Sequence, residues 1–499
     1  MKKILSSEQV RKTDSYTIVN EPITSIDLME RASQKFVDWF CSLYDLNEDI
    51  TIFSGPGNNG GDGLAIGRLL HQKGYQVSVV VVRNNDNGSE DFLTNLKRYE
   101  LSGKVIEIRN EKNIPPIHSS IVIDGLFGSG LSRPLEGVFA RVIEYLNNCP
   151  SEKISIDIAS GLFADAPINA NSVIFKPDYT ITFQQPKLAF FLPENDDFVG
   201  HWEVLDIGLD KNYIANLPSN NFMLESKDLQ KILAPRKKHS HKGTYGKALI
   251  SVGSYGKMGA ALLCGQAAMR SGVGLLYMHI PQKGYHIVQS TVPEAMVVAD
   301  MGKNHLESIP PLENYTAIGF GPGIGTHPDT IAVVGKLLSN FNKPLIIDAD
   351  GLNILAQNRE LLEIIPKKSI LTPHPGEFER LVGSWKNSYE KHEKQKALSN
   401  KYDLIIILKG AYTAISFPDG ALYFNPTGNP GMATGGSGDV LTGILVGLLA
   451  QGYTSEDVAL LGVYIHGLAG DLASEEVGMH SLIASDIVQN IPKAFKSFT

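Results

Sequence analysis

The chain has 499 residues, with 45 Lys plus Arg against 53 Asp plus Glu, so its formal net charge at pH 7 is −8. This acidic balance excludes a basic nucleic-acid-binding protein, and we expect no nucleic-acid partner. The hydrophobic fraction of 43% excludes a largely disordered chain. The length suggests roughly two to four domains, each able to bury a core of its own.

The cysteines Cys41, Cys149 and Cys264 are odd in number and far apart, which argues against a disulfide framework and a clustered cysteine zinc site. The opening MKKILSSEQVRK is not followed by a hydrophobic signal region. No uninterrupted apolar run reaches the roughly 18 residues that a membrane span requires. We therefore expect a cytoplasmic protein without a membrane partner.

Residues 49–82 predict a strand, a glycine-rich loop, a helix and a second strand. DITIF is followed by SGPGNNGGDG, then by the helical pattern LAIGRLLHQKG and the strand pattern YQVSVVVV. Two more short apolar runs end in the carboxylates of Asp124 and Asp157. This alternation predicts a parallel sheet covered on both faces, with ligands beyond the carboxyl ends of its strands.

Around residues 210–224 the periodicity fades into Asn, Pro and Ser, which is typical of a linker. No internal repeat relates the two sides of this segment. The sequence therefore predicts two different α/β domains. Further strands, each ending at a Gly, Pro or Asp loop, are predicted after the linker at residues 247–252, 273–280, 316–320, 343–348, 368–372 and 403–409.

The loop GPGNNGGDG at residues 55–63 contains the GxGxxG spacing of dinucleotide-binding turns. The acidic residue expected at the end of the second strand is missing, because Arg83 stands there. Asn58, Asn59 and Asp62 can contact a ligand or an ion through oxygen atoms while backbone N–H groups hold phosphate. The alternative is a tight turn in which Asp62 caps the helix.

Two later loops follow the same plan. DGLFGSGLSRP at residues 124–134 places a flexible Gly-Ser-Gly segment before Arg133, which either clamps a phosphate or lies in solvent. DIASGL at residues 157–162 places Ser160 three positions after a strand-end carboxylate. Together these strand ends predict a polar site at one edge of the sheet.

The strongest signal is NPGMATGGSGDVLTGILVGLLAQG at residues 429–452. Its glycines free backbone N–H groups to point into one cavity, and the apolar helix expected to begin near Val440 adds its positive end. Anionic phosphate would be stabilised there. Asp439 is placed to accept a proton from a hydroxyl that attacks this phosphate, and the alternative is a plain helix cap.

The loops GPGNNGGDG, DGLFGSGL and DIASGL together resemble the NAD(P)H-hydrate epimerase (YjeF N-terminal) domain over residues 1–215. This resemblance implies a Rossmann-like three-layer sandwich with Asp157 as its catalytic residue. It also implies K⁺ bound by Asn59, Asp124 and Ser160, and oxygen ligands suit this hard cation. The hydrated nucleotide would contact Asn58, Asn59, Gly60, Gly61, Asp62, Gly128, Ser129, Gly130, Leu131, Ser132, Arg133, Pro134 and Asp157.

The loop before Asp439 resembles the anion hole of ribokinase-like kinases, and no GxxxxGK[ST] P-loop competes with it. The motifs HKGTYGK, GPGIG, DADGLN, TPHPGEFERL and LKGAYT narrow this resemblance to the NAD(P)H-hydrate dehydratase branch, over residues 222–499. It implies a ribokinase-like α/β domain that uses Mg²⁺ with ADP or ATP.

The same resemblance implies two groups of binding residues, with Asp439 as the catalytic one. The hydrate would contact Ala260, Gly325, His374, Pro375, Gly376, Glu377, Phe378, Glu379, Arg380 and Asp439. ADP would contact Lys409, Gly410, Ala411, Tyr412, Thr413, Asn429, Pro430, Gly431, Met432, Ala433, Thr434, Gly435, Gly436, Ser437 and Gly438.

The chain departs from the two families at Ala159, Phe163 and Gly351, where Pro, Asp and Ala are respectively common. None of these positions is an implied ligand. Outside the motifs, we expect the basic run at residues 236–242 to be a solvent-exposed surface. His374 taken alone is expected to be a packed histidine at a strand end. The helix expected at residues 458–478 is amphipathic, and we expect His466 and Asp471 within it to be structural.

Taken together, the resemblances imply a repair enzyme for hydrated NADH and NADPH. The first domain would epimerise the R and S forms, with Asp157 giving and retaking a proton. The second would phosphorylate the hydroxyl of the S form with ADP, and elimination would leave NAD(P)H, AMP and phosphate. We expect a homo-oligomer whose partners are these small molecules.

Two other functions stay open from the sequence. One is a ribokinase-like small-molecule kinase fused to a nucleotide-binding regulatory domain. The other is a non-enzymatic binding or scaffold protein, whose relatives would be expected to have lost carboxylates. The presence of Asp62, Asp124, Asp157 and Asp439 argues against the scaffold.

Overall fold

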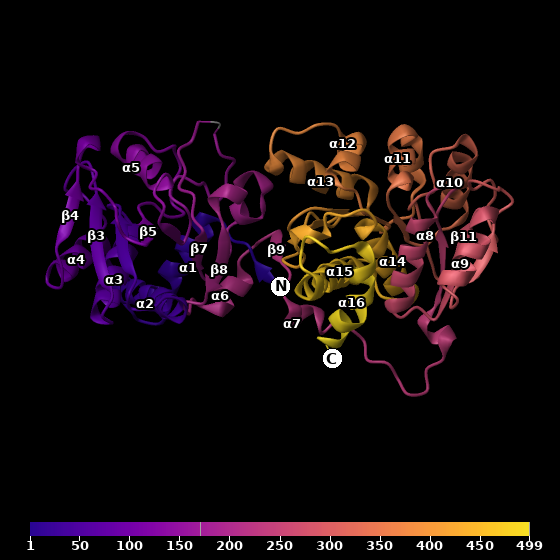
Figure 1. The fold of residues 1–499 in the computed structure, drawn as a ribbon, viewed down its shortest axis with the longest axis horizontal. Helices are drawn as coiled ribbons and strands as arrows, with labels where there is room; N and C mark the ends of the chain where they lie inside the picture. Colours follow the sequence, from indigo (N-terminus) through magenta and orange to yellow (C-terminus); the bar gives the residue numbers. More distant parts are fainter. Residues whose placement is uncertain (170, 499) are drawn as a thin grey trace. The chain divides into compact units, whose positions relative to one another are not determined.

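The computed structural model of the chain describes residues 1–169 and 171–498. It divides into two compact units, each drawn in Figure 1. The N-terminal unit comprises Lys3–Ser219 with Asn387–Tyr389, and the C-terminal unit comprises Met1–Lys2, Asn220–Lys386 and the chain from Glu390 onward. Both units are α/β, so the predicted fold class is confirmed.

The N-terminal unit contains a seven-stranded, fully parallel sheet in the order β4-β3-β2-β5-β6-β7-β8. The strands predicted within residues 49–82 and before Asp124 and Asp157 are all present. The sequence analysis did not predict β4, β7 and β8. The strands are β2 (Asp49–Ser54), β3 (Gln76–Val82), β4 (Val105–Ile108), β5 (Ile121–Gly125), β6 (Glu152–Ile156), β7 (Tyr179–Phe183) and β8 (His201–Leu205).

Helices cover both faces of this sheet, with α2 and α3 on one side and α5 on the other (Figure 1). Helix α2 buries Leu28, Ala32, Phe36 and Phe40, whose spacing of four places them on one face of the helix. Its start is capped by Thr24. The helices of this unit are α1 (Ser7–Asn20), α2 (Ser25–Leu43), α3 (Asn58–Gln72), α4 (Glu90–Glu100), α5 (Gly137–Asn147) and α6 (Lys211–Asn216).

The second sheet has eleven strands in the order β1-β9-β18-β17-β16-β15-β14-β13-β10-β11-β12. All pairs from β16 to β12 are parallel, whereas β17 runs antiparallel to both neighbours. The strands are β1 (Lys2–Lys3), β9 (Asn221–Met223), β10 (Lys247–Ser251), β11 (Leu275–Ile280), β12 (Met296–Ala299), β13 (Ala317–Phe320), β14 (Leu345–Ile347), β15 (Ile370–Leu371), β16 (Ile405–Leu408), β17 (Ala414–Ser416) and β18 (Leu422–Phe424).

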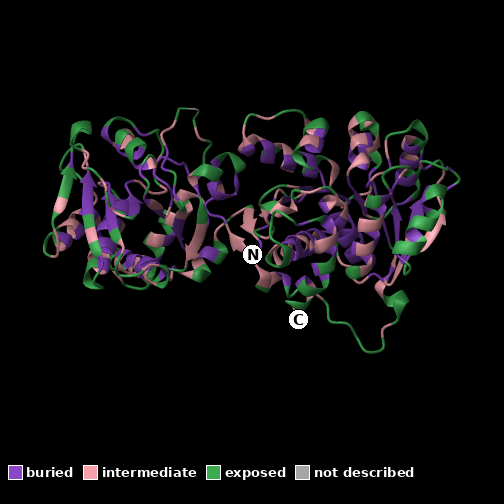
Figure 2. Cartoon of the chain, viewed as in Figure 1, coloured by how far each residue is buried: buried purple, intermediate pink, exposed green. Residues whose placement is uncertain are grey.

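Successive residues of these strands enter different cores, because side chains alternate across a sheet. Ile346 of β14 packs with α8, α14, α15 and α16, while Leu345 and Ile347 pack with α10, α11 and α12 on the other face. Figure 2 shows this burial along the strands. The helices are α7 (Ser226–Leu229), α8 (Met258–Arg270), α9 (Tyr285–Thr291), α10 (Pro328–Asn340), α11 (Asp350–Gln357), α12 (Pro375–Val382), α13 (Ser388–Tyr402), α14 (Ser437–Ala450), α15 (Ser455–Val477) and α16 (Ala484–Lys496).

Three sequence-based boundaries differ from the structure. Helix α3 begins at Asn58, six residues before the predicted start, and α14 begins at Ser437 and not near Val440. Both predictions followed the first apolar residues, because glycine has a low helix propensity. Residues 210–224 also carry more structure than a linker, since α6 and β9 lie within them.

Two further sequence expectations concern the chain as a whole. Among the described residues, no helix combines the length and apolar character needed to cross a membrane. Cys41, Cys149 and Cys264 are free thiols, so the prediction that they form no disulfide framework is confirmed.

Candidate functional sites in the two units

A cavity of about 890 Å³ lies in the N-terminal unit, where the loops after β2, β5 and β6 meet α1 and α2. This is the carboxyl edge of the sheet, where the sequence placed the site. Gly60, Gly61 and Pro134 are absent from its wall. The predicted residues that line it are Asn58, Asn59, Asp62, Gly128, Ser129, Gly130, Leu131, Ser132, Arg133 and Asp157.

Two glycines allow the loops at this edge of the sheet to pack closely against one another. A Cβ atom on Gly55 would lie 2.0 Å from the carbonyl oxygen of Leu126, and one on Gly60 would lie 1.7 Å from the carbonyl oxygen of Gly55. Only glycine permits these approaches. The residue that precedes α3 as its cap is Gly57, so the alternative in which Asp62 caps this helix is wrong.

Asp124 is fully buried at the end of β5 and surrounded by donors. Its carboxylate accepts hydrogen bonds from Ser160 Oγ at 2.6 Å, Ser160 N at 2.8 Å and Leu126 N at 3.1 Å. Burial raises the pKa of Asp124 to about 6, although these hydrogen bonds oppose the rise. The structure therefore joins two of the three implied K⁺ ligands directly.

The third implied ligand, Asn59, is buried in the same cavity wall. Its side-chain nitrogen is buried without a hydrogen-bond partner among the described residues. Amide oxygen and nitrogen are assigned from their partners, so a flipped amide would present its oxygen there instead. A Cβ atom on Gly128 of the neighbouring loop would lie 3.3 Å from Asn59 Oδ1, so the glycine leaves room for this side chain.

Asp157 follows β6 in a left-handed backbone conformation, with φ of 65°. Its Oδ1 accepts hydrogen bonds from Thr182 Oγ1 and Phe183 N, both at 3.1 Å, and forms an ion pair with Lys187. Lys187 is only 3% exposed and also donates to Thr182 Oγ1 at 2.6 Å. These contacts hold the Asp157 carboxyl in one orientation.

The sequence analysis did not identify Lys187. The sequence signal that could have identified it is a single lysine beside apolar residues in QQPKLAFF. A lysine buried among such residues is rare unless it is paired with a carboxylate. Its partner lies 30 positions away in the sequence. Only the fold brings the two side chains together.

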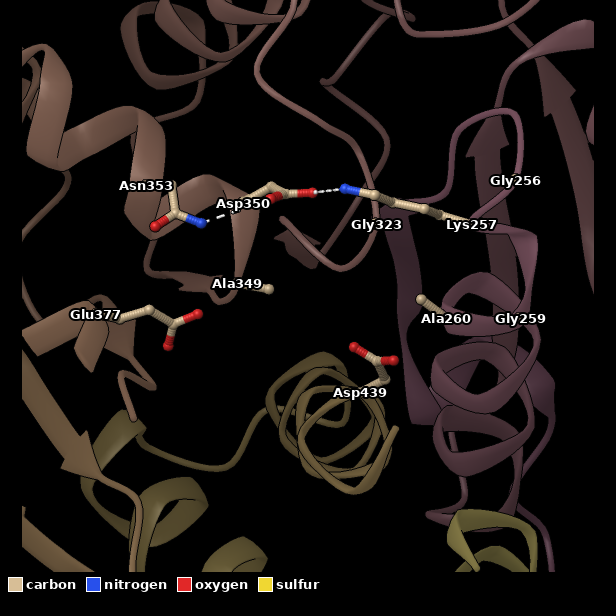
Figure 3. Close-up of a pocket in the computed structure, with 10 residues that line it drawn as sticks. All are labelled: Gly256, Lys257, Gly259, Ala260, Gly323, Ala349, Asp350, Asn353, Glu377 and Asp439. Atoms are coloured by element: carbon tan, nitrogen blue, oxygen red, sulfur yellow. Dashed lines mark hydrogen bonds and ion pairs between the residues drawn. The ribbon is translucent and has the colours of Figure 1, made fainter. Parts of the chain in front are cut away.

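A second cavity, of about 390 Å³, lies in the C-terminal unit (Figure 3). Three predicted hydrate-site residues line it, namely Ala260, Glu377 and Asp439. The remaining wall residues, which the sequence did not single out individually, are Gly256, Lys257, Gly259, Gly323, Ala349, Asp350 and Asn353.

Asp439 lies in the first turn of α14, whose capping residue is Gly436 with φ of 94°. The alternative in which Asp439 is the plain cap is therefore wrong. The first hydrogen bond of the helix runs from Val440 N to Gly436 O, and Ser437 N donates to Thr434 O at 3.4 Å, so the N–H groups of Gly438 and Asp439 stay available to a ligand. Burial and the nearby Asp348 raise the pKa of Asp439 to about 6, against the opposing charge of Lys409.

Lys409, at the end of β16, meets the glycine loop at this helix start. Its Nζ donates to Asp348 Oδ1 at 2.8 Å, and Thr442 Oγ1 donates to Asp348 Oδ2 at 2.7 Å. A Cβ atom on Gly438 would lie 3.2 Å from Lys409 Nζ. The two predicted nucleotide-binding segments, 409–413 and 429–438, therefore meet at this lysine.

Burial on its own lowers the pKa of Lys409, but the carboxylates of Asp348 and Glu377 outweigh it and raise that pKa overall. The lysine therefore stays charged. A permanent ammonium group beside open N–H groups is a favourable environment for phosphate.

Asp350 links two loops across the second cavity. Its Oδ2 accepts hydrogen bonds from Lys257 Nζ at 3.0 Å and Gly325 N at 2.8 Å (Figure 3 shows the lysine pair). The preceding Ala349 has φ of 48°, a strained value for a residue other than glycine. Gly325 thus supports the wall through Asp350 without lining it.

The TPHPGEFERL segment contributes to the site in part. His374 is a half-exposed capping residue whose Nδ1 accepts a hydrogen bond from Gly376 N at 3.0 Å, so its interpretation as a packed histidine is wrong.

The other residues of this segment reach the cavity only in part. The Phe378 side chain lies in the core and cannot line the site. Arg380 reaches the cavity wall through Asn353, at 2.8 Å. Pro375, Gly376 and Glu379 are also absent from the cavity wall.

The two residues of α15 expected to be structural support the glycine loop. Asp471 accepts hydrogen bonds from Gly428 N at 2.9 Å and Asn429 Nδ2 at 3.0 Å. His466 Nε2 lies 2.9 Å from Ser437 O, and burial lowers the pKa of this histidine to about 4. At neutral pH His466 is uncharged and donates to that carbonyl.

The two units match two known families. Residues 25–189 match the YjeF-related protein N-terminus, and residues 248–493 match NAD(P)H-hydrate dehydratase. The bifunctional NAD(P)H-hydrate repair enzyme of Moorella thermoacetica is 34% identical over 99% of this chain and 97% of its own length. The chain belongs to the family of bifunctional NAD(P)H-hydrate repair enzymes.

Other members and structures agree with this family. The bifunctional NAD(P)H-hydrate repair enzyme of Thermofilum pendens is 35% identical over 94% of this chain and 92% of its own length. A crystal structure of the ADP/ATP-dependent NAD(P)H-hydrate dehydratase from Bacillus subtilis, co-crystallised with ATP/Mg²⁺, is 33% identical with a TM-score of 0.50. That match covers 56% of this chain and 99% of the other.

The close approach at Gly60 predicts a large loss of stability for Gly60→Ala. We expect the unfolding free energy of the N-terminal unit to fall by about 2–3 kcal/mol, because the added methyl group meets a backbone oxygen that cannot move alone. Calorimetric melting measures this. Gly57→Ala is the matched control, since nothing lies within 4 Å of its Cβ position. Equal melting temperatures for both variants would contradict the packing described.

Proposed function

We propose that this chain repairs hydrated NADH and NADPH through two activities. The N-terminal unit, with an epimerase domain at residues 1–215, interconverts the R and S forms. The C-terminal unit, with a dehydratase domain at residues 222–499, returns the S form to NAD(P)H at the expense of ADP. The observation that carries the proposal is the position of Asp439, in a cavity wall at the open start of α14 and close to Lys409.

Dehydration requires that a poor leaving group be converted into a good one. Asp439 takes the proton from the hydroxyl of the hydrate, whose oxygen then attacks the terminal phosphorus of ADP and displaces AMP. Phosphate next leaves the ring carbon as the ring nitrogen supplies an electron pair. Loss of a proton from the neighbouring carbon restores NAD(P)H. The N–H groups of Gly435, Gly436 and Gly438 stabilise charge on the transferred group.

The cavity wall fits Mg²⁺ bound with the nucleotide, since Asp350 and Glu377 offer carboxylate oxygens. When bound, the ion would neutralise charge on the phosphates. The ATP/Mg²⁺ co-crystal of the Bacillus subtilis relative supports a nucleotide with Mg²⁺. We favour ADP as donor, with AMP and phosphate as products.

Epimerisation requires that the same hydroxyl leave and return on the opposite face of the ring. Asp157 exchanges a proton with this oxygen while the ring nitrogen stabilises the positively charged intermediate. Asn58, Asp62 and residues 128–133 surround the nucleotide in the cavity. The carboxylate of Asp124, Ser160 Oγ and the side chain of Asn59 fit a K⁺ ion, which would hold the two loops together.

Homo-oligomerisation and a cytoplasmic location stay predictions from the sequence.

The test of both activities is the recovery of NADH absorbance from separated R and S hydrates, with ADP, with ATP or with neither. We expect both epimers to be recovered, and only when nucleotide is present. A stable phosphorylated product without recovered absorbance would favour a kinase fused to a regulatory domain. Recovery of the S form alone would refute the epimerase.

Asp439→Asn is expected to slow dehydration of the S hydrate by about 10³-fold, because the amide cannot take up the proton. ADP affinity, measured by calorimetry, should change little. Since burial raises the pKa of Asp439 to about 6, the wild-type rate should fall as pH drops below about 6, and the variant should lack this dependence. Glu393→Gln, at a side chain 73% exposed and paired with Lys396, is the control. Unchanged dehydration in Asp439→Asn would favour the scaffold function.

Potassium binding predicts a cation-specific effect on the N-terminal unit. At constant ionic strength, exchanging NaCl for KCl should raise the melting temperature of this unit by about 3 °C and accelerate epimerisation, because K⁺ binds only the folded site. Asp124→Asn should abolish both effects. Equal behaviour in the two salts would remove K⁺ from the proposal.

A further inference from the structure

One side of the first cavity is formed by α1, a helix that contains none of the motifs identified in the sequence. Helix α1 turns Val10, Arg11, Asp14 and Ile18 toward the cavity, at the spacing of a single helix face. The adjacent stripe of the helix is fixed to the unit by the buried Thr13 and Thr17. Asp14 is therefore presented to the cavity from a regular, anchored element.

The carboxyl group of Asp14 has an unusual environment. Neither a backbone nor a side-chain hydrogen bond reaches it within the described residues. Its pKa is raised to about 7 by burial and by the charge of Asp157, while Lys187 opposes the rise. Asp14 is half-buried, and its carboxyl lines the cavity without a hydrogen-bond donor from the protein to fix it, so no contact within the fold explains its position.

The charged groups around Asp14 come from several elements. Asp157 follows β6 and pairs with Lys187, which in turn lies after β7. Asp62 on α3 is also electrostatically coupled to Asp14, and burial raises the pKa of Asp62 well above its ordinary range. Asp91, Arg11 and Arg133 line the same cavity. Asp14 and Asp157 are thus a neighbouring pair in which only Asp157 has hydrogen-bond partners.

We propose that Asp14 is the second proton-transfer residue of the epimerase, acting together with Asp157. This inference rests on the proposed function and deepens it. Removal of a hydroxyl from one face of the ring and its return to the other are two proton transfers at different positions. Two carboxyl groups from different elements can each carry out one of these proton transfers, whereas a single fixed carboxyl would have to carry out both, one after the other.

In one direction of the reaction, each of the two carboxyl groups transfers one proton. The neutral Asp14 carboxyl gives its proton to the hydroxyl oxygen, the carbon–oxygen bond breaks, and water departs with the bonding pair. The ring nitrogen lone pair forms a carbon–nitrogen double bond. Water then adds to the other face, its oxygen forms the new bond, and the double-bond pair returns to nitrogen. The Asp157 carboxylate takes the released proton. Exchange with water then returns a proton to Asp14 and removes one from Asp157, and the reverse reaction exchanges the two roles.

The test compares Asp14→Asn with the wild-type full chain on separated R and S hydrates of NADH and excess ADP. We expect recovery from the R form to slow by about 10²-fold after subtraction of the rate without enzyme, mainly through kcat. Recovery from the S form depends only on the other unit and should be unchanged. Glu8→Gln is the matched control, because Glu8 lies on the same helix, is 69% exposed and pairs with Lys12.

Two further readouts separate proton transfer from a structural role. The acid form of Asp14 is present below about pH 7, so wild-type epimerisation in the R-to-S direction should decline above that pH, and Asp14→Asn should lose this decline. The raised pKa also means that the folded state loses stability as pH rises from about 4 to about 7. Asp14→Asn should therefore melt at an equal or higher temperature at pH 8.

Each remaining outcome overturns the inference. An R-form rate within about threefold of the wild type, or a loss of rate accompanied by a lower melting temperature and an unchanged pH profile, would make Asp14 dispensable or structural. If the wild-type chain itself recovered only the S form, the proposed epimerase would fail and this inference with it. The S-form control distinguishes that result from failure of the Asp14 variant alone.

Discussion

Carboxylates buried at the carboxyl ends of parallel strands are the constraint on which both candidate sites depend. An isolated buried charge is costly, so each strand-end carboxylate needs a cation, a set of donors or a raised pKa. Asp124 has donors from Ser160, Asp157 has Lys187, and Asp348 has Lys409. The glycine turns allow the chain to approach closely enough to supply these partners.

The two units use the same division of labour with different residues. In each, one lysine pairs with a strand-end carboxylate and a second carboxyl remains without a firm partner and has a raised pKa. That second group is Asp439 in the C-terminal unit and Asp14 in the N-terminal unit. A carboxyl whose pKa lies near neutrality can exchange protons with a substrate at little cost, whereas pairing fixes the geometry of a carboxyl. Asp348 therefore organises its site, and the unpaired Asp439 and Asp14 are available for chemistry. Asp157 combines a fixed orientation with the proton transfer proposed for it.

Similar-looking polar groups elsewhere show why the environment matters more than residue type. Ser251, His279 and Asp300 form a chain of contacts, with Ser251 Oγ 3.1 Å from His279 Nδ1 and His279 Nε2 2.8 Å from Asp300. The order of these groups is that of a hydrolytic triad. His279 and Asp300 are nevertheless 1% and 0% exposed, and Asp300 is saturated by donors. No substrate reaches them, so they stabilise the loop after β12.

The sequence by itself determined the α/β class, most strands around both sites and the loops that carry Asn59, Asp157 and Asp439. These features are local, because glycine turns, apolar runs and strand-end carboxylates are recorded in consecutive residues. Tertiary structure alone decided that Lys187 pairs with Asp157, that Asp348 contacts Lys409, and that Phe378 belongs to a core. It also decided that Asp14 on α1 faces the first cavity. Such placements depend on which elements pack together, and the pKa of a carboxyl depends on burial and charges that distant parts of the chain supply.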